Sequence, residues 1–371
     1  MEYTTFGRTG LRVSRFGLGC MRLPKDEAEA IRIVRYAVDN GVNYLDTAYA
    51  YKGNEAVVGK ALKEGYRDRV VLATKSPIWN ITCHEDFEKY LDEELERLGT
   101  DHIDVYLLHS LGQENWEKVQ KYDGLTFLDK MVRKGKILHK ACSVHNTLDG
   151  FKKIADSFDW EMMQIQLNIL DEFQQAGVEG LKYAAEKGMA VVVMEPLRGG
   201  SLLNCAPKEV HELVRSFPKQ RPLAEWCFRW LYSKPEVSVI LSGTSSLEQL
   251  QDNLRIFDHS SPNEMTDEEL KLIRSIQKAY LSKKRIGCTG CRDCMPCPHG
   301  VSIPEIFRLY NDYELVKPHA VDKGNYQDVL VAAGNGADQC VACGLCETHC
   351  PQGLKIPELL KTAHQALTET E

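Results

Sequence analysis

Cysteines are concentrated near the C-terminal end of the chain. Of the thirteen cysteines in the sequence, eight lie between Cys288 and Cys350. They form two runs, Cys288-x2-Cys291-x2-Cys294-x2-Cys297-Pro and Cys340-x2-Cys343-x2-Cys346-x3-Cys350-Pro. Three thiolates at two-residue intervals can surround one face of a [4Fe–4S] cluster, and the fourth cysteine of such a run typically ligates the other cluster of a pair. The spacing therefore predicts two [4Fe–4S] clusters.

This exchange of fourth ligands divides the cysteines into two predicted sets. They are Cys288, Cys291 and Cys294 with Cys350, and Cys340, Cys343 and Cys346 with Cys297. The first run has two residues rather than three before its last cysteine, so Cys297 fits the pattern less closely. Zinc is the alternative, but a zinc site usually pairs two separated Cys-x2-Cys elements, which favours clusters here. His299 and His349 lie among the cysteines, and we expect them to be surface or packing residues.

Four polar residues in the first third of the chain could form a proton-transfer site. Asp46, Lys75 and His109 each close a run of strand-forming residues, and Tyr51 follows the first of these runs. A nearby ammonium favours the phenolate of a tyrosine and lowers its pKa from about 10. Lys75 could supply that charge, held by a charge-assisted hydrogen bond that it donates to Asp46. His109 could then orient a substrate carbonyl while Tyr51 protonates its oxygen as hydride reaches the carbon.

Each of these residues also has a purely structural interpretation when it is taken singly. An aspartate and a lysine can form an ordinary ion pair, a tyrosine can be a packing aromatic, and a histidine can be a satisfied polar residue. Their joint placement at the ends of successive strands favours the chemical interpretation.

The elements that must position these residues alternate regularly along the chain. Eight strand-like runs are predicted, at Phe16–Leu18, Asn43–Asp46, Val70–Thr74, Ile103–His109, Leu138–Ser143, Met162–Gln166, Ala190–Met194 and Val237–Leu241. Amphipathic segments such as Asp26–Asn40 and Asp86–Leu98 lie between them and read as crossover helices. Eight strand-and-helix repeats predict a parallel sheet that closes into a (β/α)8 barrel. Chemistry in such a barrel sits where the strands end, so the four polar residues should converge.

An open, doubly wound α/β sheet is the alternative architecture. It would normally carry a glycine-rich phosphate turn after its first strand, and Phe16-Gly-Leu-Gly-Cys20 lacks that spacing. We therefore predict a (β/α)8 TIM barrel over residues 1–281, preceded by a short hairpin at Thr4–Val13. A small, mostly helical iron–sulfur domain is predicted over residues 282–371, with Ile303–Val316 as one of its helices.

The same segments resemble a known family. Asp46-Thr-Ala-Tyr-Ala-Tyr51, Leu72-Ala-Thr-Lys75 and Asp104-Val-Tyr-Leu-Leu-His109 are similar to the signature segments of the aldo-keto reductases, and the resemblance covers roughly residues 1–280. It implies a catalytic tetrad of Asp46, Tyr51, Lys75 and His109 and a reduced nicotinamide nucleotide as hydride source. The tail resembles the dicluster modules appended to some dehydrogenase subunits and to a subgroup of barrel reductases.

The resemblance also implies residues that hold the nicotinamide. Ser143 and Gln164 match family positions that bind its amide, whereas His145 stands where the family has asparagine, with Asn146 beside it. Met194 stands where an aromatic residue usually stacks on the ring, and a thioether can also cover a ring face.

A phosphate seat is expected after the eighth strand. Hydroxyl groups and amides at a helix N-terminus can bind phosphate, and a plain helix cap is the alternative. The candidate residues are Ser242, Gly243, Thr244, Ser246, Gln249 and Asn253. In relatives that prefer NADP, a lysine and an arginine grip the 2′-phosphate where this chain has Gly243 and Gln249. The cofactor is therefore expected to be NADPH or NADH, without a choice between them.

Composition narrows the range of partners and locations. The net charge of −7 argues against a nucleic-acid or anionic-membrane surface, because such partners call for basic patches. We find neither a secretory signal nor a run of apolar residues long enough to span a membrane, so we expect a cytosolic protein. In that reducing compartment, thirteen cysteines indicate metal or thiol chemistry rather than disulfides.

The predicted function is reduction of an aldehyde or ketone, or the reverse oxidation of an alcohol, with a nicotinamide cofactor. The clusters would serve electron transfer or the docking of a redox protein. A non-catalytic electron-transfer or redox-sensing protein on an inherited barrel scaffold is the alternative. The loops that carry Lys52, Trp79, His84 and Trp116 would shape the substrate site, without identifying the substrate.

Overall fold

The computed structural model describes residues 1–259, 261–315 and 323–369. It divides into two compact units, and each contains segments that are distant in sequence. The first comprises Met1–Pro196 and Ala224–Leu270, and the second comprises Leu197–Leu223 and Lys271–Glu371. The second unit therefore includes a segment that follows the seventh barrel strand, in addition to the cysteine-rich tail.

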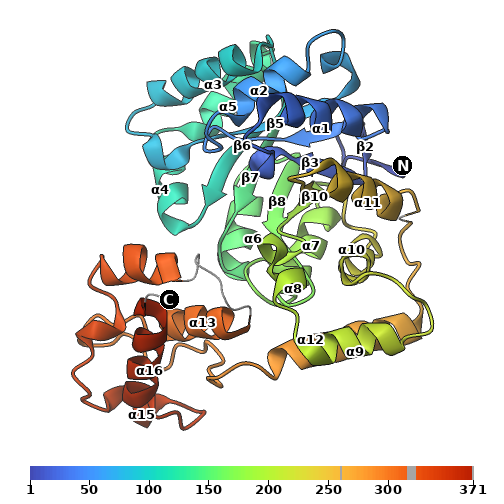
Figure 1. Ribbon diagram of the computed structural model, residues 1–371. Helices are drawn as coiled ribbons and strands as arrows, with labels where there is room; N and C mark the ends of the chain where they lie inside the picture. The colour runs from blue at the N-terminus through green and yellow to red at the C-terminus, as the bar shows by residue number, and fades with distance from the viewer. Residues whose placement is uncertain (260, 316–322, 370–371) are drawn as a thin grey trace. The chain divides into compact units, whose positions relative to one another are not determined.

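The first unit is built on a closed barrel of eight parallel strands surrounded by helices (Figure 1). The strands are β3 (Phe16–Gly19), β4 (Tyr44–Asp46), β5 (Val71–Ser76), β6 (Ile103–Leu111), β7 (Ile137–Val144), β8 (Met162–Gln166), β9 (Ala190–Met194) and β10 (Val239–Gly243). Neighbours in the sequence are neighbours in the barrel, and β10 closes it by pairing with β3. The predicted (β/α)8 barrel is confirmed, and the open sheet is excluded.

Helices cover the outside of the barrel with one apolar face each. They are α1 (Glu27–Asp39), α2 (Asn54–Ala61), α3 (Glu85–Leu98), α4 (Gln113–Lys121), α5 (Gly124–Arg133), α6 (Leu148–Asp156), α7 (Gly177–Glu186), α10 (Leu223–Tyr232) and α11 (Leu247–Phe257). In α3, for example, Phe87, Leu91, Leu95 and Leu98 recur at three- and four-residue intervals and are buried. Asp26 caps α1 by accepting a hydrogen bond from the backbone N–H of Glu29.

A hairpin closes the end of the barrel where the strands begin. It consists of β1 (Tyr3–Thr5) and β2 (Arg12–Ser14), which pair in antiparallel fashion. Phe6 in its turn is fully buried in the same apolar cluster as Tyr44 and Val239, which lie at the starts of β4 and β10. Gly7 has a φ of 53°, and a Cβ there would lie 2.3 Å from the backbone nitrogen of Ala190. The turn therefore requires glycine to pack this closely.

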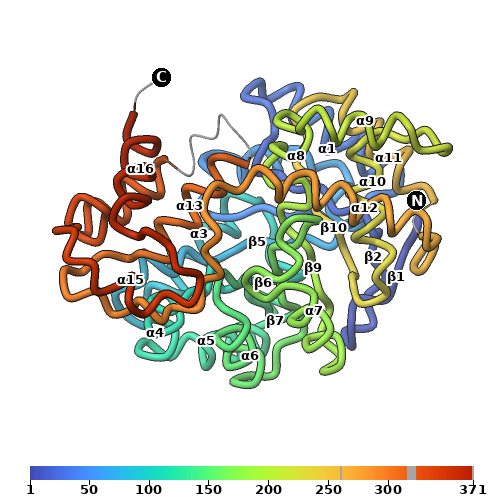
Figure 2. The backbone as a smooth tube through the Cα atoms, turned by 90° about the horizontal axis from the view of Figure 1, so that it is seen from below, coloured from blue at the N-terminus to red at the C-terminus, as the bar shows by residue number. Residues whose placement is uncertain are grey.

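The second unit is helical around its own core. Its helices are α8 (Ser201–Asn204), α9 (Lys208–Ser216), most of α12 (Asp267–Leu281), α13 (Ile303–Leu315), α15 (Leu345–His349) and α16 (Ile356–Thr368), with a π-helical segment at Asn325–Val331. Helices α13 and α16 pack together (Figure 2) and bury Phe307, Tyr326 and Leu360 in one apolar cluster. The helix predicted over Ile303–Val316 is α13, and Val316 lies outside the described residues.

Among the helices in the described ranges, none combines the length and apolar character needed to cross a membrane.

Candidate functional sites

Asp46 and Lys75 form a buried ion pair inside the barrel, at the ends of adjacent strands. In β5, Val71 and Ala73 belong to the interior cluster, and Lys75 continues this alternation. The Lys75 ammonium donates hydrogen bonds to Oδ1 of Asp46 at 2.6 Å and to the backbone oxygen of Thr47 at 2.7 Å. Burial is the largest single influence and by itself would lower the pKa of Lys75, but the charge and hydrogen bond of Asp46 together with those of Tyr51 outweigh burial and raise it. Lys75 therefore carries a positive charge in the barrel interior.

Tyr51 lies against this charge. It follows β4 in a tight turn, and Nζ of Lys75 is 5.1 Å from the centre of its ring. Burial raises the pKa of Tyr51 by more than the Lys75 charge lowers it, and Asp46 raises it further. This differs from the lowered pKa expected from sequence, because that expectation did not include desolvation of the phenolate. The phenol is therefore neutral at physiological pH and has a proton to give.

His109 completes the group from β6. Its ring centre lies 6.2 Å from that of Tyr51 and 5.2 Å from that of Trp79, which follows β5 in the short helix Ile78–Asn80. Burial lowers the pKa of His109 well below 6.5, and the nearby Lys75 and His145 lower it further. Its Nδ1 is buried and has no hydrogen-bond partner among the described residues. A neutral imidazole of this kind can donate one N–H to a carbonyl oxygen.

Next along the barrel come the residues predicted to hold the nicotinamide. Ser143 of β7 pairs in register with Gln164 of β8, and the Ser143 hydroxyl accepts a 2.7 Å hydrogen bond from the backbone of Ser110. The Gln164 amide donates to the sulfur of Met194 at 3.7 Å, so these two predicted residues meet. The Gln164 carbonyl oxygen is buried without a partner in the described part of the chain. An unused buried acceptor beside a thioether suits a planar amide-bearing ring.

His145 and Asn146 lie just after the end of β7 and contact other protein groups. Nδ1 of His145 lies 3.2 Å from the side-chain oxygen of Gln175. The side-chain oxygen of Asn146 accepts from the backbone of Thr147 at 2.8 Å, immediately before α6. The side-chain oxygen of Asn146 therefore binds the backbone of Thr147, the residue that caps α6.

The segment after β10 combines a helix cap with unused polar groups. Ser246 caps α11 by accepting from the backbone of Gln249, whose side chain accepts in return from the backbone of Ser245 at 3.0 Å. The Thr244 hydroxyl is buried without a partner among the described residues, while the Ser242 hydroxyl accepts from Asn253 at 3.2 Å. Thus Ser246 and Gln249 are engaged in the cap, and Thr244 offers a free hydroxyl.

Arg22 is a residue at this site that the sequence interpretation missed. It lies just after β3 in the short helix Cys20–Arg22, and its Cβ, Cγ and Cδ would lie 3.3–3.4 Å from a Cβ at Gly243. The signal that could have found it is barrel closure, which places the residues after the first barrel strand beside those after the eighth. Arg22 therefore places a basic side chain beside Gly243, the position where relatives that prefer NADP have a basic residue.

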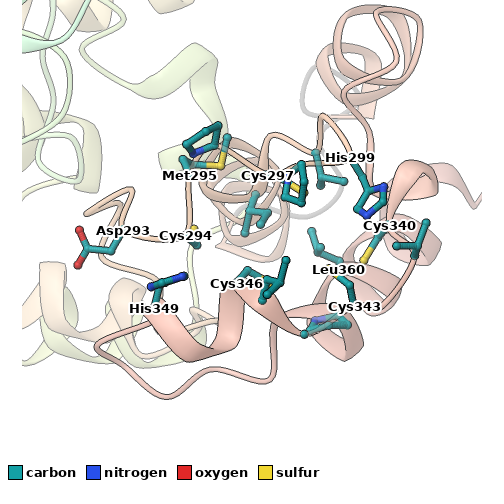
Figure 3. Close-up of a pocket in the computed structure, with 18 residues that line it drawn as sticks. Asp293, Cys294, Met295, Cys297, His299, Cys340, Cys343, Cys346, His349 and Leu360 are labelled. Carbon is teal, nitrogen blue, oxygen red and sulfur yellow. The ribbon is translucent and has the colours of Figure 1, made fainter.

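The cysteines of the second unit line two hollows. A cavity of about 310 Å³ is lined by Cys340, Cys343 and Cys346 together with Cys297 from the first run (Figure 3). A narrower recess of about 20 Å³ is lined by Cys288, Cys291 and Cys294 together with Cys350 from the second run. Cys294 borders both hollows, and the exposed His299 and His349 line the larger one. Each run thus contributes its fourth cysteine to the hollow of the other.

Both runs wind in the same way. Gly290 and Arg292 lie two and four residues after Cys288 and have φ values of 73° and 69°. At the equivalent positions after Cys340, Ala342 and Gly344 have φ values of 56° and 74°. Left-handed residues between successive cysteines turn the thiols toward one side of the loop, and two of the four are not glycine, which is uncommon away from constrained sites.

Two of the cysteine thiols that line these hollows, those of Cys294 and Cys346, are partly buried. Burial raises the pKa of Cys294, and it raises the pKa of Cys346 to about 11. Both thiols therefore need adjacent positive charge, such as that of iron, to ionise at neutral pH. The backbone N–H of Gly290 already donates to the sulfur of Cys288 at 3.4 Å. Thiol donors, apolar walls and backbone N–H groups suit iron–sulfur clusters.

Comparisons with known proteins agree with both parts of the chain. The aldo/keto reductase family model matches residues 15–278, and the 4Fe-4S dicluster domain model matches residues 287–354. The chain is 29% identical over 315 residues to the uncharacterized oxidoreductase YrpG of Bacillus subtilis, covering 71% of this chain and 94% of that protein. It is 26% identical over 306 residues to L-galactose dehydrogenase of Arabidopsis thaliana, covering 74% of this chain and 94% of that protein.

Solved structures show the same likeness. The holo form of aldo-keto reductase AKR11C1 from Bacillus halodurans matches with a TM-score of 0.65 and 28% identity, covering 75% of this chain and 97% of that one. The thermostable aldo-keto reductase Tm1743 shares the fold with a TM-score of 0.62 at 24% identity, covering 74% of this chain and 100% of that one.

Proposed function

Because the chain belongs to the aldo/keto reductase family, we propose that it reduces an aldehyde or ketone with a nicotinamide cofactor, or catalyses the reverse oxidation of an alcohol. The observation that carries this proposal is the buried Lys75–Asp46 pair beside Tyr51 and His109. A charged lysine excluded from water, a neutral phenol and a neutral imidazole are the groups that carbonyl reduction needs. A non-catalytic electron-transfer protein transfers no proton to a substrate, so it would not require this arrangement.

The four residues divide the work of proton transfer. His109 would donate its N–H to the substrate carbonyl oxygen and fix its direction. A bound reduced nicotinamide would supply the hydride that the carbonyl carbon takes up. The Tyr51 hydroxyl gives its proton to the oxygen as negative charge develops there. Lys75 stabilises the phenolate that remains, and Asp46 holds Lys75 in place. The carbonyl thus gains one hydride and one proton and becomes an alcohol.

The residues proposed for the nucleotide fall into two groups. Ser143, Gln164 and Met194 would hold the nicotinamide, through the free carbonyl oxygen of Gln164 and the sulfur of Met194. The segment from Ser242 to Asn253 would hold the phosphates and adenosine, with Thr244 offering a buried hydroxyl. Arg22 beside Gly243 is a candidate for the 2′-phosphate. Its position makes NADPH as reasonable a cofactor as NADH.

We test the reductase proposal with one substitution in a screen of carbonyl substrates with NADPH and NADH. Tyr51→Phe removes only the transferable proton and should lower kcat by about 10²–10⁴-fold with nucleotide affinity retained. Tyr183→Phe is the matched control, because that hydroxyl lies on the surface and bonds Asp156. If Tyr51→Phe left a detected activity unchanged, the barrel would be a scaffold and the alternative of an electron-transfer protein would stand.

For the tail, we propose two [4Fe–4S] clusters, held by Cys288, Cys291, Cys294 and Cys350 and by Cys340, Cys343, Cys346 and Cys297. The two hollows support this division, because each contains three cysteines of one run and one of the other. Such clusters supply one-electron transfer, whereas nicotinamide exchanges hydride. We therefore propose that they connect the protein to a redox partner. Two reduced clusters, each giving one electron, would together with two protons from solvent reduce one carbonyl without nicotinamide. Dithionite-reduced protein should therefore turn substrate over, and no turnover, with or without flavin, would contradict this connection.

Three broader proposals follow from the same features. We keep the division into a reductase domain at 1–281 and an iron–sulfur domain at 282–371. We also propose a cytosolic location, in keeping with clusters and cysteines that form no disulfide among the described residues. The net charge of −7 favours small molecules and proteins over nucleic acid as partners.

A further inference from the structure

The chain that leaves β9 is joined to the iron–sulfur unit. Residues 197–223 fall in the same compact unit as the cysteine-rich tail. Within that unit, the guanidinium of Arg198 lies 2.7 Å from the carboxylate of Asp312 in α13, with the two side chains only 12% and 5% exposed. The Tyr280 hydroxyl also donates to the backbone oxygen of Leu202. An ion pair this well buried holds its two segments together more firmly than a surface pair.

The backbone around Arg198 needs outside support. Glu195 and Arg198 have positive φ values of 53° and 50°, and Gly199 and Gly200 follow with 69° and 94°. Left-handed conformations of non-glycine residues persist only when surrounding contacts hold them. The Asp312 contact supplies such support at Arg198. The path of this segment, which begins three residues after Met194, therefore depends on a residue of the iron–sulfur unit.

Asp312 is itself tied to the cysteines through α13. Arg308 fixes the second oxygen of Asp312 at 2.7 Å. The adjacent Asn311 side chain binds the backbone N–H and oxygen of Ile286, at 2.9 and 2.8 Å, two residues before the first cysteine run. On the same helix, Ile303 and Phe307 line the recess with Cys288, Cys291 and Cys294. One helix thus contacts both the cysteine recess and the segment after β9.

We propose that Asp312 is a positioning residue for the nicotinamide site. Through Arg198, it holds the backbone that continues from Met194, so the affinity for nucleotide depends on an intact iron–sulfur unit. This inference rests on the proposed function, in which Met194 covers the nicotinamide. It assigns the iron–sulfur unit a structural effect on the reductase that is separate from any transfer of electrons.

The experiment compares cluster-loaded protein carrying Asp312→Asn with a matched control. Glu305→Gln removes another carboxylate of α13, which pairs with Arg308 and, among the described residues, forms no ion pair with residues 197–223. For each protein we would measure iron content, the dissociation constants of NADH and NADPH by fluorescence, and hydrogen exchange of residues 195–205 without nucleotide. Asp312→Asn should weaken binding at least about fivefold and speed exchange in the segment, with Glu305→Gln behaving as wild type.

A double variant tests whether Asp312 acts through Arg198. Combining Arg198→Gln with Asp312→Asn should add little to the single Arg198→Gln effect, because both changes remove the same bond. Additive effects would overturn the coupling. If the Asp312→Asn protein did not bind clusters, Arg198→Gln would provide the test, because this residue lies outside α13. Unchanged hydrogen exchange of residues 195–205 in Arg198→Gln would overturn the proposal.

The two proposals fail in different ways. If wild-type protein bound neither nucleotide, the proposed function would fall, while the exchange measurement would still decide whether Asp312 holds the segment. If the wild type bound nucleotide but Asp312→Asn matched Glu305→Gln in affinity and exchange, the positioning role would fall and the reductase proposal would stand.

Discussion

Nζ of Lys75 lies 2.6 Å from Oδ1 of Asp46, and the two side chains are only 1% and 3% exposed. The second oxygen of Asp46 is buried without a partner among the described residues. A pair of this kind is strongly interdependent, since removal of one partner leaves the other charge uncompensated in the barrel interior. Stability and proton transfer should therefore respond together when either residue is changed.

Asp46→Asn should make the protein both less stable and less active. Without the carboxylate, burial lowers the pKa of Lys75, so the ammonium loses its proton nearer to neutral pH. We expect the free energy of unfolding to fall by about 3–5 kcal/mol, the usual effect of breaking a buried pair. Urea denaturation followed by tryptophan fluorescence measures this loss. Glu29→Gln, which removes an exposed pair with Arg32, should change it little.

Carbonyl reduction should be insensitive to pH through the neutral range. Burial holds the pKa of Tyr51 above its ordinary value of about 10 and that of His109 well below about 6.5. The tyrosine therefore stays protonated and the histidine stays neutral from mildly acidic to mildly basic pH. The kcat for reduction should fall only as pH rises through the pKa of Tyr51. A step in kcat near pH 6.5 would show that His109 titrates and would contradict its assignment as a neutral donor.

The raised pKa of Lys75 also has a consequence for stability. A basic group whose pKa is higher in the folded protein than in the unfolded chain stabilises the fold fully when the pH is below the pKa of that group in the unfolded chain. That stabilisation is lost as pH rises through the folded pKa, which lies above the ordinary lysine value. Wild type should therefore lose stability at strongly alkaline pH. Lys75→Met should show less of that alkaline loss in the same denaturation experiment.

Arg22→Met tests the choice of nucleotide. Arg22 packs along Gly243, where relatives that prefer NADP carry a basic residue. If Arg22 contacts the 2′-phosphate, its removal should weaken NADPH binding by about 1.5–3 kcal/mol, the worth of a charged hydrogen bond, and leave NADH nearly unchanged. Fluorescence titration measures both constants. Lys25→Met is the control for a nearby loss of charge, and equal effects on NADPH and NADH would remove Arg22 from the phosphate site.

Periodicity predicted the barrel because each strand carries its own local signal. The predicted strands Met162–Gln166 and Ala190–Met194 coincide with β8 and β9. The last strand, predicted over Val237–Leu241, begins instead at Val239, where pairing with β9 starts. Val237 is held by its carbonyl, which accepts from the Arg15 side chain. Where a strand begins can depend on its pairing with neighbouring strands, and the residues of the strand itself do not indicate that position.

The site was partly predictable for the same reason. Residues at strand ends converge in any barrel, so the sequence alone predicts that Asp46, Lys75 and His109 lie close together. The direction of the Tyr51 pKa depends on burial by residues from several elements, and no local pattern encodes it. The Arg198–Asp312 pair joins segments more than a hundred positions apart. Neither residue belongs to a motif, so only the three-dimensional structure reveals their contact.

Gly59→Ala should destabilise the protein although alanine is the better helix former. Gly59 lies within α2, and a Cβ there would lie 2.6 Å from the backbone oxygen of Leu98. Backbone cannot yield as a flexible side chain can, so we expect a loss of about 1–3 kcal/mol, against the gain of about 1 kcal/mol that helix propensity alone predicts. Gly287→Ala is the control, because nothing lies within 4 Å of its added Cβ. A stabilised Gly59→Ala variant would show that α2 and the end of α3 separate easily.

The crossed arrangement of cysteines can be tested by changing each fourth cysteine alone. Cys350 lines the recess of the first run and Cys297 lines the cavity of the second. If the runs exchange ligands, Cys350→Ser should disturb the cluster bound by Cys288, and Cys297→Ser should disturb the one bound by Cys340. Iron content with electron paramagnetic resonance of the reduced protein would show which signal is lost in each variant.

Matched variants within the runs decide between crossed and uncrossed ligation. Under crossed ligation, Cys350→Ser should lose the same signal as Cys288→Ser, and Cys297→Ser the same signal as Cys340→Ser. Under uncrossed ligation, Cys350→Ser would instead resemble Cys340→Ser. Cys83→Ser, which changes an exposed cysteine of the barrel unit, should leave both signals and the iron content as in wild type. Crossed ligation would mean that neither cluster can be bound by one run alone, because each hollow draws its fourth thiol from the other run.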